Sequence, residues 1–133
     1  MSTLQVYKED AHLMGNHFEL SVVSDNPEWA HDCIQAGINE IQRIEKKLTT
    51  FSSESETAKI NEMAGIRAVE VSLETIELIE RSIKISQITQ GAFDITYGSI
   101  DKKLWNFDEK MTALPDKETA KKMVRLINYR NII

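Results

Sequence analysis

The chain has 133 residues, of which 41% are apolar and 28% are charged, the balance of an ordinary globular domain. Sixteen basic and 21 acidic residues give a net charge of −5, which argues against nucleic acid as a partner, because phosphate backbones attract basic faces. No apolar run is long enough to predict a membrane span, and the single cysteine, Cys33, excludes an internal disulfide.

The N-terminal part predicts a strand followed by a long helix. Apolar and polar residues alternate from Gly15 to Val23, as in a half-buried strand. Asn26 can cap a helix that starts at Pro27 and runs from about Glu28 to Leu48. Helical spacing places one apolar stripe along this helix, made of Ala30, Ile34, Ile38, Ile41, Ile44 and Leu48.

The middle of the chain predicts two more helices and a short strand. Ser53 opens a capping-box spacing that favours a short helix over Glu54–Met63. Alternation over Ala68–Val71 favours a strand, and Ser72 can cap a helix over Leu73–Gln90. The predicted buried side of that helix consists of Ile76, Ile79, Ile83 and Ile88.

The C-terminal part is irregular and polar from Gly91 to Leu114, and then predicts a helix over Lys117–Leu126. Asn128–Ile133 has the composition of a strand. Since termini are normally polar and loose, an apolar strand at Ile133 indicates that the chain is cut there, the alternative being a terminal edge strand.

Few residues have the spacing that chemistry requires. His12, His17 and His31 are scattered and match no zinc-site pattern. Cys33 has no base in view and is interpreted as a small core residue. No glycine-rich phosphate loop occurs, so the residues themselves identify no catalytic group and no metal site.

Two segments nevertheless have the composition of a binding site. Met14–Phe18 lies at a strand entrance, and Thr89–Gly98 combines small residues with an aromatic, an Asp and a Thr. Small residues let a backbone approach a ligand, and Phe93 or Trp105 can stack on a flat ring, although a packed surface loop is the alternative. Asp94 has no evident local cap to make, so its carboxylate either lies idle in water or faces a ligand donor.

From Leu13 to Ile132 the chain resembles the ApbE-type flavin transferases, which are FAD:protein FMN transferases once called thiamine-biosynthesis lipoproteins. The segments that carry the resemblance follow in the family's order: Met14-Gly15, Leu48–Phe51, Ser55-Glu56, Lys59–Asn61, Thr89–Gly98, Trp105 with Phe107, Pro115 and Ile127–Arg130. The departures from the family pattern are Asn16, Phe51, Gln90, Ile95, Ser99 and Asn106. Gln90 and Asn106 stand where the family has glycine.

The resemblance implies an α+β fold, T-fold-like, with long helices packed on an antiparallel or mixed sheet. It further implies that residues 1–133 form one domain that is the N-terminal, incomplete portion of the family's chain. The activity implied is a magnesium-dependent transfer of FMN from FAD to a Thr or Ser of a target protein through a phosphoester. The magnesium ligands are expected in a later half of the family's chain, so we expect this chain alone to be inactive.

The same resemblance assigns FAD contacts to Met14, Phe51, Ala92, Phe93 and Asp94. Phe93 as a hydrophobic plug and Met14 as a core residue are the alternatives. The implied partners are FAD and a flavin-accepting redox protein. A non-catalytic FAD-binding fragment and a small protein-interaction domain remain alternative functions. Without a signal peptide the expected location is cytoplasmic, or periplasmic or membrane-anchored if a signal has been lost.

Overall fold

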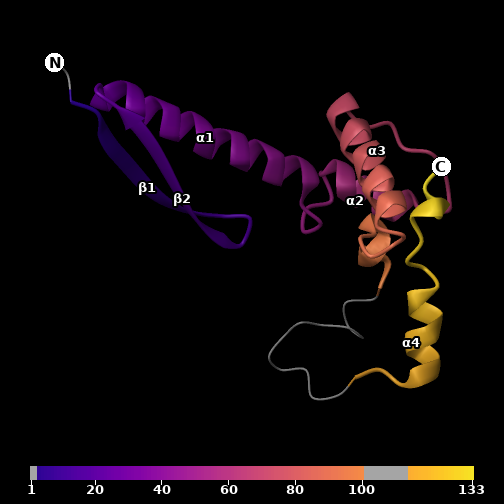
Figure 1. Ribbon diagram of the computed structural model, residues 1–133. Helices are drawn as coiled ribbons and strands as arrows, with labels where there is room; N and C mark the ends of the chain where they lie inside the picture. The colour runs from indigo at the N-terminus through magenta and orange to yellow at the C-terminus, as the bar shows by residue number, and fades with distance from the viewer. Residues whose placement is uncertain (1–2, 101–113) are drawn as a thin grey trace. The chain divides into compact units, whose positions relative to one another are not determined.

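A computed structural model of the chain describes residues 3–100 and 114–133 (Figure 1). These residues divide into two compact units, Met1–Glu70 and Val71–Ile133, and each is treated by itself. Among the described residues, the first unit holds a two-stranded sheet and two helices, and the second holds two helices and two 3-10 turns. The prediction of one domain over residues 1–133 stays a prediction, and Trp105, Asn106 and Phe107 lie outside the described residues.

The sheet of the first unit is an antiparallel hairpin of β1 (Gln5–Leu13) and β2 (Asn16–Ser24). Its register runs from Gln5 opposite Ser24 to Leu13 opposite Asn16. Met14 and Gly15 form the loop, with φ angles of 52° and 70°. Positive φ at both loop residues defines a type I′ turn, whose twist matches that of the strands. The strand predicted over Gly15–Val23 is therefore confirmed, whereas β1 was not predicted.

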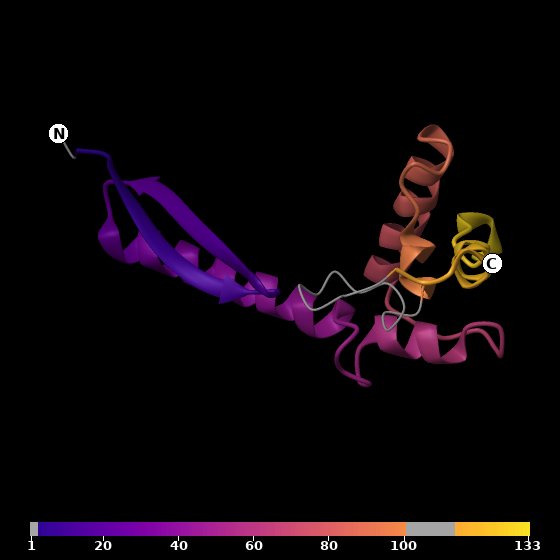
Figure 2. The same cartoon turned by 90° about the horizontal axis from the view of Figure 1, so that it is seen from below.

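Helix α1 (Pro27–Leu48) begins and ends where the sequence predicts. The Asn26 Oδ1 accepts a hydrogen bond from the Trp29 amide at 3.1 Å, and Pro27 takes the first helical position, where no N–H is needed. The hairpin lies along one side of α1 in both views of the ribbon (Figures 1 and 2). Its strands thereby cover one face of the helix.

The core of the first unit lies between the hairpin and the first turns of α1. Ala30 and Ile34 are 0% and 2% exposed, which confirms the start of the predicted stripe. At Gly37 a Cβ would lie 2.9 Å from Leu20 Cδ2, so a larger residue here would require the Leu20 side chain to shift. The remaining stripe residues, Ile38, Ile41, Ile44 and Leu48, are half-buried.

Helix α2 (Glu56–Met63) starts two residues later than predicted. Ser55, not Ser53, is its cap, and its hydroxyl accepts from the Ala58 amide at 3.0 Å while donating to the Thr49 carbonyl. Because these two bonds satisfy the hydroxyl as donor and as acceptor, Ser55 can be almost completely buried. The strand predicted over Ala68–Val71 is wrong, because these residues have no ladder partner among the described residues.

Helix α3 (Leu73–Ile88) opens the second unit and buries a face that its sequence does not predict. Its buried residues are Thr75 and Ser86, whereas Ile76 and Ile88 are 42% and 72% exposed, so the predicted isoleucine stripe is wrong for these two. Ile79 and Ile83, the other two isoleucines of that stripe, are half-buried. The Ser86 hydroxyl donates to the Ser82 carbonyl at 3.0 Å, which satisfies it inside the unit.

The described part of the second unit also holds three short elements: the 3-10 turn η1 (Ile95–Ser99), helix α4 (Lys117–Val124) and the 3-10 turn η2 (Tyr129–Asn131). Both η1 and η2 pack against α3. Helix α4 confirms the helix predicted over Lys117–Leu126, apart from its last two residues. The strand predicted over Asn128–Ile133 is wrong, since this segment turns back instead of extending. Within the part of the chain described, no helix has the length and apolar character to cross a membrane.

Candidate functional site

The second unit contains a cavity of about 310 Å³ at the end of α3. It is lined by Gln90, Gly91, Asp94, Val124, Ile127, Asn128, Tyr129 and Arg130. One wall is thus the turn that follows α3, and the other is the segment that leads from α4 into η2. Of the five residues predicted to contact FAD, only Asp94 lines the cavity.

The turn after α3 is a Schellman motif with an unusual residue in it. The Gly91 amide donates to the Ser86 carbonyl at 2.8 Å, and the Gln90 amide donates to the Gln87 carbonyl at 3.2 Å. Gln90 and Gly91 have φ angles of 54° and 86°. Both residues are therefore left-handed, and Gln90 takes the first of the two positions, where glycine is favoured.

Thr89 fixes the chain where it leaves this motif. Its hydroxyl donates to the Ile85 carbonyl at 2.9 Å and accepts from the Phe93 amide at 3.1 Å. The last turn of α3 is therefore joined to the turn Ala92–Phe93–Asp94. Phe93 is 43% exposed, so it is not a buried plug.

Asp94 joins two segments that are distant in the sequence. Its Oδ1 accepts from the Thr96 amide at 2.9 Å and from the Thr96 hydroxyl at 2.6 Å, and its Oδ2 accepts from the Tyr129 amide at 2.8 Å. The Thr96 hydroxyl in turn accepts from the Asn128 amide at 2.8 Å. We call these four hydrogen bonds the Asp94 latch. The expectation that Asp94 has no local cap to make is wrong, since Asp94 caps η1.

The hydrogen bonds of the latch also set the charge state of Asp94. Partial burial acts to raise the pKa of Asp94, but the hydrogen bonds from Thr96 and Tyr129 together outweigh it and hold the pKa below its ordinary value. The carboxylate is thus ionised at neutral pH. An ionised carboxylate has about four acceptor positions, and the described residues use three of them in the latch.

Met14 and Phe51 lie in the first unit. The Met14 amide donates to Glu45 Oε1 at 3.0 Å, which ties the hairpin turn to the last turns of α1, and the residue is 38% exposed. Phe51 follows α1 and is 92% exposed. Both side chains are accessible to a ligand, and neither is a core residue.

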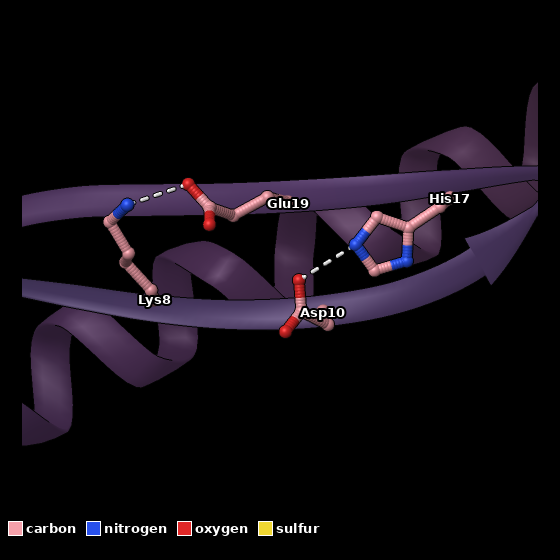
Figure 3. A network of polar contacts seen from close by, with 4 residues as sticks. All are labelled: Lys8, Asp10, His17 and Glu19. Carbon is pink, nitrogen blue, oxygen red and sulfur yellow. Dashed lines mark hydrogen bonds and ion pairs between the residues drawn. The ribbon is translucent and has the colours of Figure 1, made fainter.

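The outer face of the hairpin carries a polar network (Figure 3). Lys8 pairs with Glu19 at 2.7 Å, and His17 Nε2 lies 3.1 Å from Asp10 Oδ1. The hydrogen bond and the charge of Glu19 raise the pKa of Lys8. The rings of His12 and His17 meet edge to face at 5.6 Å. Over residues 3–100 and 114–133, no three His, Cys, Asp or Glu side chains converge as a metal site would require.

Sequence reasoning did not select Thr96, Asn128 or Tyr129 as site residues. The segment Ile127–Arg130 stood out only as part of the family resemblance, and nothing in its local pattern indicates a contact with Asp94. In the sequence, the cavity residues Val124 and Ile127 have the pattern of ordinary apolar residues at the end of a helix.

Comparison with known proteins identifies the family of this chain. Residues 14–133 match the model of the ApbE family, so the chain belongs to the ApbE family. No curated protein sequence matches the chain significantly.

Solved structures of ApbE proteins have the same fold as this chain. An ApbE protein from Thermotoga maritima superposes with a TM-score of 0.85 at 26% identity, covering 97% of this chain and 41% of that one. The flavin transferase ApbE from Vibrio cholerae gives 0.80 at 18% identity, covering 96% and 42%. The flavinyl transferase ApbE from Pseudomonas stutzeri gives 0.76 at 20% identity, covering 96% and 41%. The predicted α+β fold class is confirmed, and the chain spans about two fifths of the length of these structures.

Proposed function

We propose that this chain is the FAD-holding portion of a flavin transferase. The reaction is the transfer of FMN from FAD to a Thr or Ser of a flavin-accepting redox protein, through a phosphoester. The observation that carries the proposal is the family match over residues 14–133, together with neighbours that are flavin transferases by name. A non-catalytic FAD-binding module is the alternative, and a transfer assay separates the two.

The chemistry of the cavity suits part of an FAD molecule. Its volume of about 310 Å³ is at the lower end of the roughly 300–1,000 Å³ typical of ligand pockets, so it can take one portion of a dinucleotide. Asp94 offers one acceptor position to a ring N–H or a ribose hydroxyl. Arg130, whose guanidinium lies 5.1 Å from the centre of the Tyr129 ring, offers a cation to a phosphate.

We further propose that Met14, Phe51, Ala92 and Phe93 contact the rest of FAD. Met14 is 38% exposed and Phe51 is 92% exposed, and an aromatic face such as that of Phe51 can stack on a flat ring. Ala92 and Phe93 belong to the same turn as Asp94, which Thr89 fixes at its start. No described residue acts as the nucleophile or base in this proposal.

Magnesium is the metal that we propose for the complete enzyme. When bound, it would neutralise the charge that develops on the pyrophosphate. The residues described here provide no three-ligand group for it, so we derive no step through the metal. Its ligands are proposed to lie in a part of the enzyme that this chain does not contain.

The test is an FAD titration of the chain by calorimetry, paired with an FMN-transfer assay on an acceptor peptide with FAD and magnesium. We expect saturable FAD binding without transfer. Arg130→Gln should weaken binding, whereas Lys121→Gln, which changes an exposed lysine of α4 outside the cavity, should not. Absence of FAD binding would contradict the proposal, and transfer by this chain alone would contradict the proposed need for a further portion.

A further inference from the structure

We propose that Thr96 is a positioning residue that joins the two walls of the cavity and so sets its affinity for FAD. The inference rests on the proposed function, because FAD is the ligand it concerns. Thr96 does not line the cavity itself and acts through Asp94 and Asn128, both of which do.

The Thr96 hydroxyl uses its proton and a lone pair in opposite directions. It donates to Asp94 Oδ1 at 2.6 Å and accepts from the Asn128 amide at 2.8 Å, across 32 residues of sequence. A carboxylate accepts but cannot donate, so the hydroxyl proton must point at Asp94 and a lone pair must face Asn128. The orientation of the hydroxyl is therefore fixed from both sides.

This arrangement couples the turn after α3 to the segment that carries Arg130. The negative charge of Asp94 polarises the Thr96 hydroxyl, which makes the hydroxyl oxygen a better acceptor for the Asn128 amide. The Tyr129 amide is held by the other carboxylate oxygen at 2.8 Å. Consecutive amides, Asn128 and Tyr129, are thus held by the latch directly before Arg130, so the position of that cation depends on Thr96.

Valine has nearly the shape of threonine but can neither donate nor accept. Thr96→Val therefore leaves one Asp94 oxygen and the Asn128 amide without this partner, while the side chain fills the same space. Thr96→Ser keeps the hydroxyl and should restore both bonds. These two substitutions separate the hydrogen-bonding role from simple packing.

Thr119 provides a matched control on α4. Its hydroxyl donates to Asp116 Oδ2 at 2.6 Å, the same bond and distance as between Thr96 and Asp94. Asp116 accepts two amides of its own helix, from Glu118 and Thr119, and neither Asp116 nor Thr119 lines the cavity. Thr119→Val thus removes an equivalent bond without touching the latch.

The experiment measures FAD dissociation constants and amide spectra of the 133-residue chain for the three variants. We expect Thr96→Val to weaken FAD binding about tenfold, since it disrupts bonds to a charged group, and Thr96→Ser and Thr119→Val to remain within about twofold. In ¹⁵N spectra, the Asn128 and Tyr129 amides should shift and lose exchange protection in Thr96→Val and recover in Thr96→Ser.

The outcomes distinguish this inference from the proposed function. Unchanged affinity in Thr96→Val, or equal weakening in Thr119→Val, would refute the positioning role while leaving FAD binding intact. No FAD binding by the parent chain would refute the proposed function and with it the role of Thr96 in affinity. Unaltered Asn128 and Tyr129 amides in Thr96→Val would refute the latch itself, whatever FAD does.

Discussion

Replacing Asp94 by asparagine tests the latch directly, because the substitution keeps the shape of the side chain and removes its charge. Asparagine has one carbonyl oxygen and one NH₂ group. Whichever way the amide is turned, the NH₂ group must face a donor, either the two groups of Thr96 or the amide of Tyr129. At least one end of the latch therefore opens.

The size of the loss can be worked from the three hydrogen bonds. A hydrogen bond to a charged group contributes about 1.5–3 kcal/mol, but these three share one carboxylate and are not additive. The carboxylate is also partly open to water, which can replace a lost partner. We therefore expect Asp94→Asn to lower the free energy of unfolding of the second unit by about 2 kcal/mol, a large share of the roughly 5–15 kcal/mol typical of a domain.

The assay is urea unfolding followed residue by residue in ¹⁵N spectra, so that each unit reports on itself. Amides of α3 report on the second unit, and amides of the hairpin report on the first. For a unit of this size the urea dependence is about 1 kcal/mol per M, so the α3 midpoint should fall by about 2 M while the hairpin midpoint stays unchanged.

Asp116→Asn is the control, because Asp116 also has a lowered pKa from bonds to Thr119 and Glu118, all within one helix turn. Its effect on the α3 midpoint should be clearly smaller than that of Asp94→Asn. Equal effects of the two substitutions would show that Asp94 is only a local cap. A fall of the hairpin midpoint in Asp94→Asn would show that the effect does not arise in the latch.

Four further outcomes are expected. Met14→Asn should raise the melting temperature of the hairpin by a few degrees, because asparagine suits the first position of a type I′ turn, and should weaken FAD binding in a titration. Gln90→Gly should raise the α3 urea midpoint by about 1 M, since a left-handed non-glycine residue costs about 1 kcal/mol, whereas Gln90→Val should lower it. Ile34→Ala should destabilise the first unit by about 2–5 kcal/mol in the same experiment. Finally, the stabilisation from Asp94 should be complete above the unfolded carboxyl pKa of about 3.9 and be lost as the pH falls through the lower folded pKa. The free energy of unfolding of the second unit should therefore fall less steeply with decreasing pH in Asp94→Asn than in the parent chain.

In the first unit, β2 and α1 follow closely from the sequence, whereas β1, the start of α2 and the segment from Ala68 onward do not. Helix α1 has strong caps and a periodic apolar stripe, and β2 alternates cleanly. Strand β1 carries Lys8, Asp10 and His12 on its outer face, and its half-buried positions include Glu9, so its inner face is not apolar enough to reveal a strand. Its identity comes from pairing with β2, which a local pattern does not encode.

The second unit was predicted less well because α3 packs against irregular segments. Periodicity assigns isoleucines to the buried side of α3, yet the face that is most buried carries Thr75 and Ser86. Small hydroxyl residues can be buried when they bond to their own helix, as Ser86 does. Segments such as η1 and η2 have no period from which their packing against α3 could be foreseen.

The contacts of the candidate site, like the packing of α3, could not be predicted from a local sequence pattern. The sequence singled out Asp94 as a residue that contacts FAD, which stays a prediction, but its hydrogen-bond partners Thr96 and Tyr129 were not foreseen. Tyr129 is 35 residues away, and it contributes a backbone amide, which any residue carries. No property of the side chains from Asn128 onward could have indicated that contact. Backbone partners of this kind become visible only in the fold.

Three positions break local rules of structure, two of them in the first unit and one in the second. Met14 and Gln90 are left-handed residues with side chains that disfavour this conformation, and Phe51 exposes 92% of an apolar ring. Such violations cost free energy, and natural chains retain them mainly where function compensates the cost. Met14 and Phe51 are residues to which the family resemblance assigns FAD contacts, and Gln90 lines the cavity beside Asp94. The strained turn at Gln90 also brings an amide side chain to a wall where the family's glycine has none. At Met14 and Phe51 the departures from regular structure fall on residues that the resemblance assigns to FAD, whereas Gln90 is a residue to which the resemblance assigns no contact.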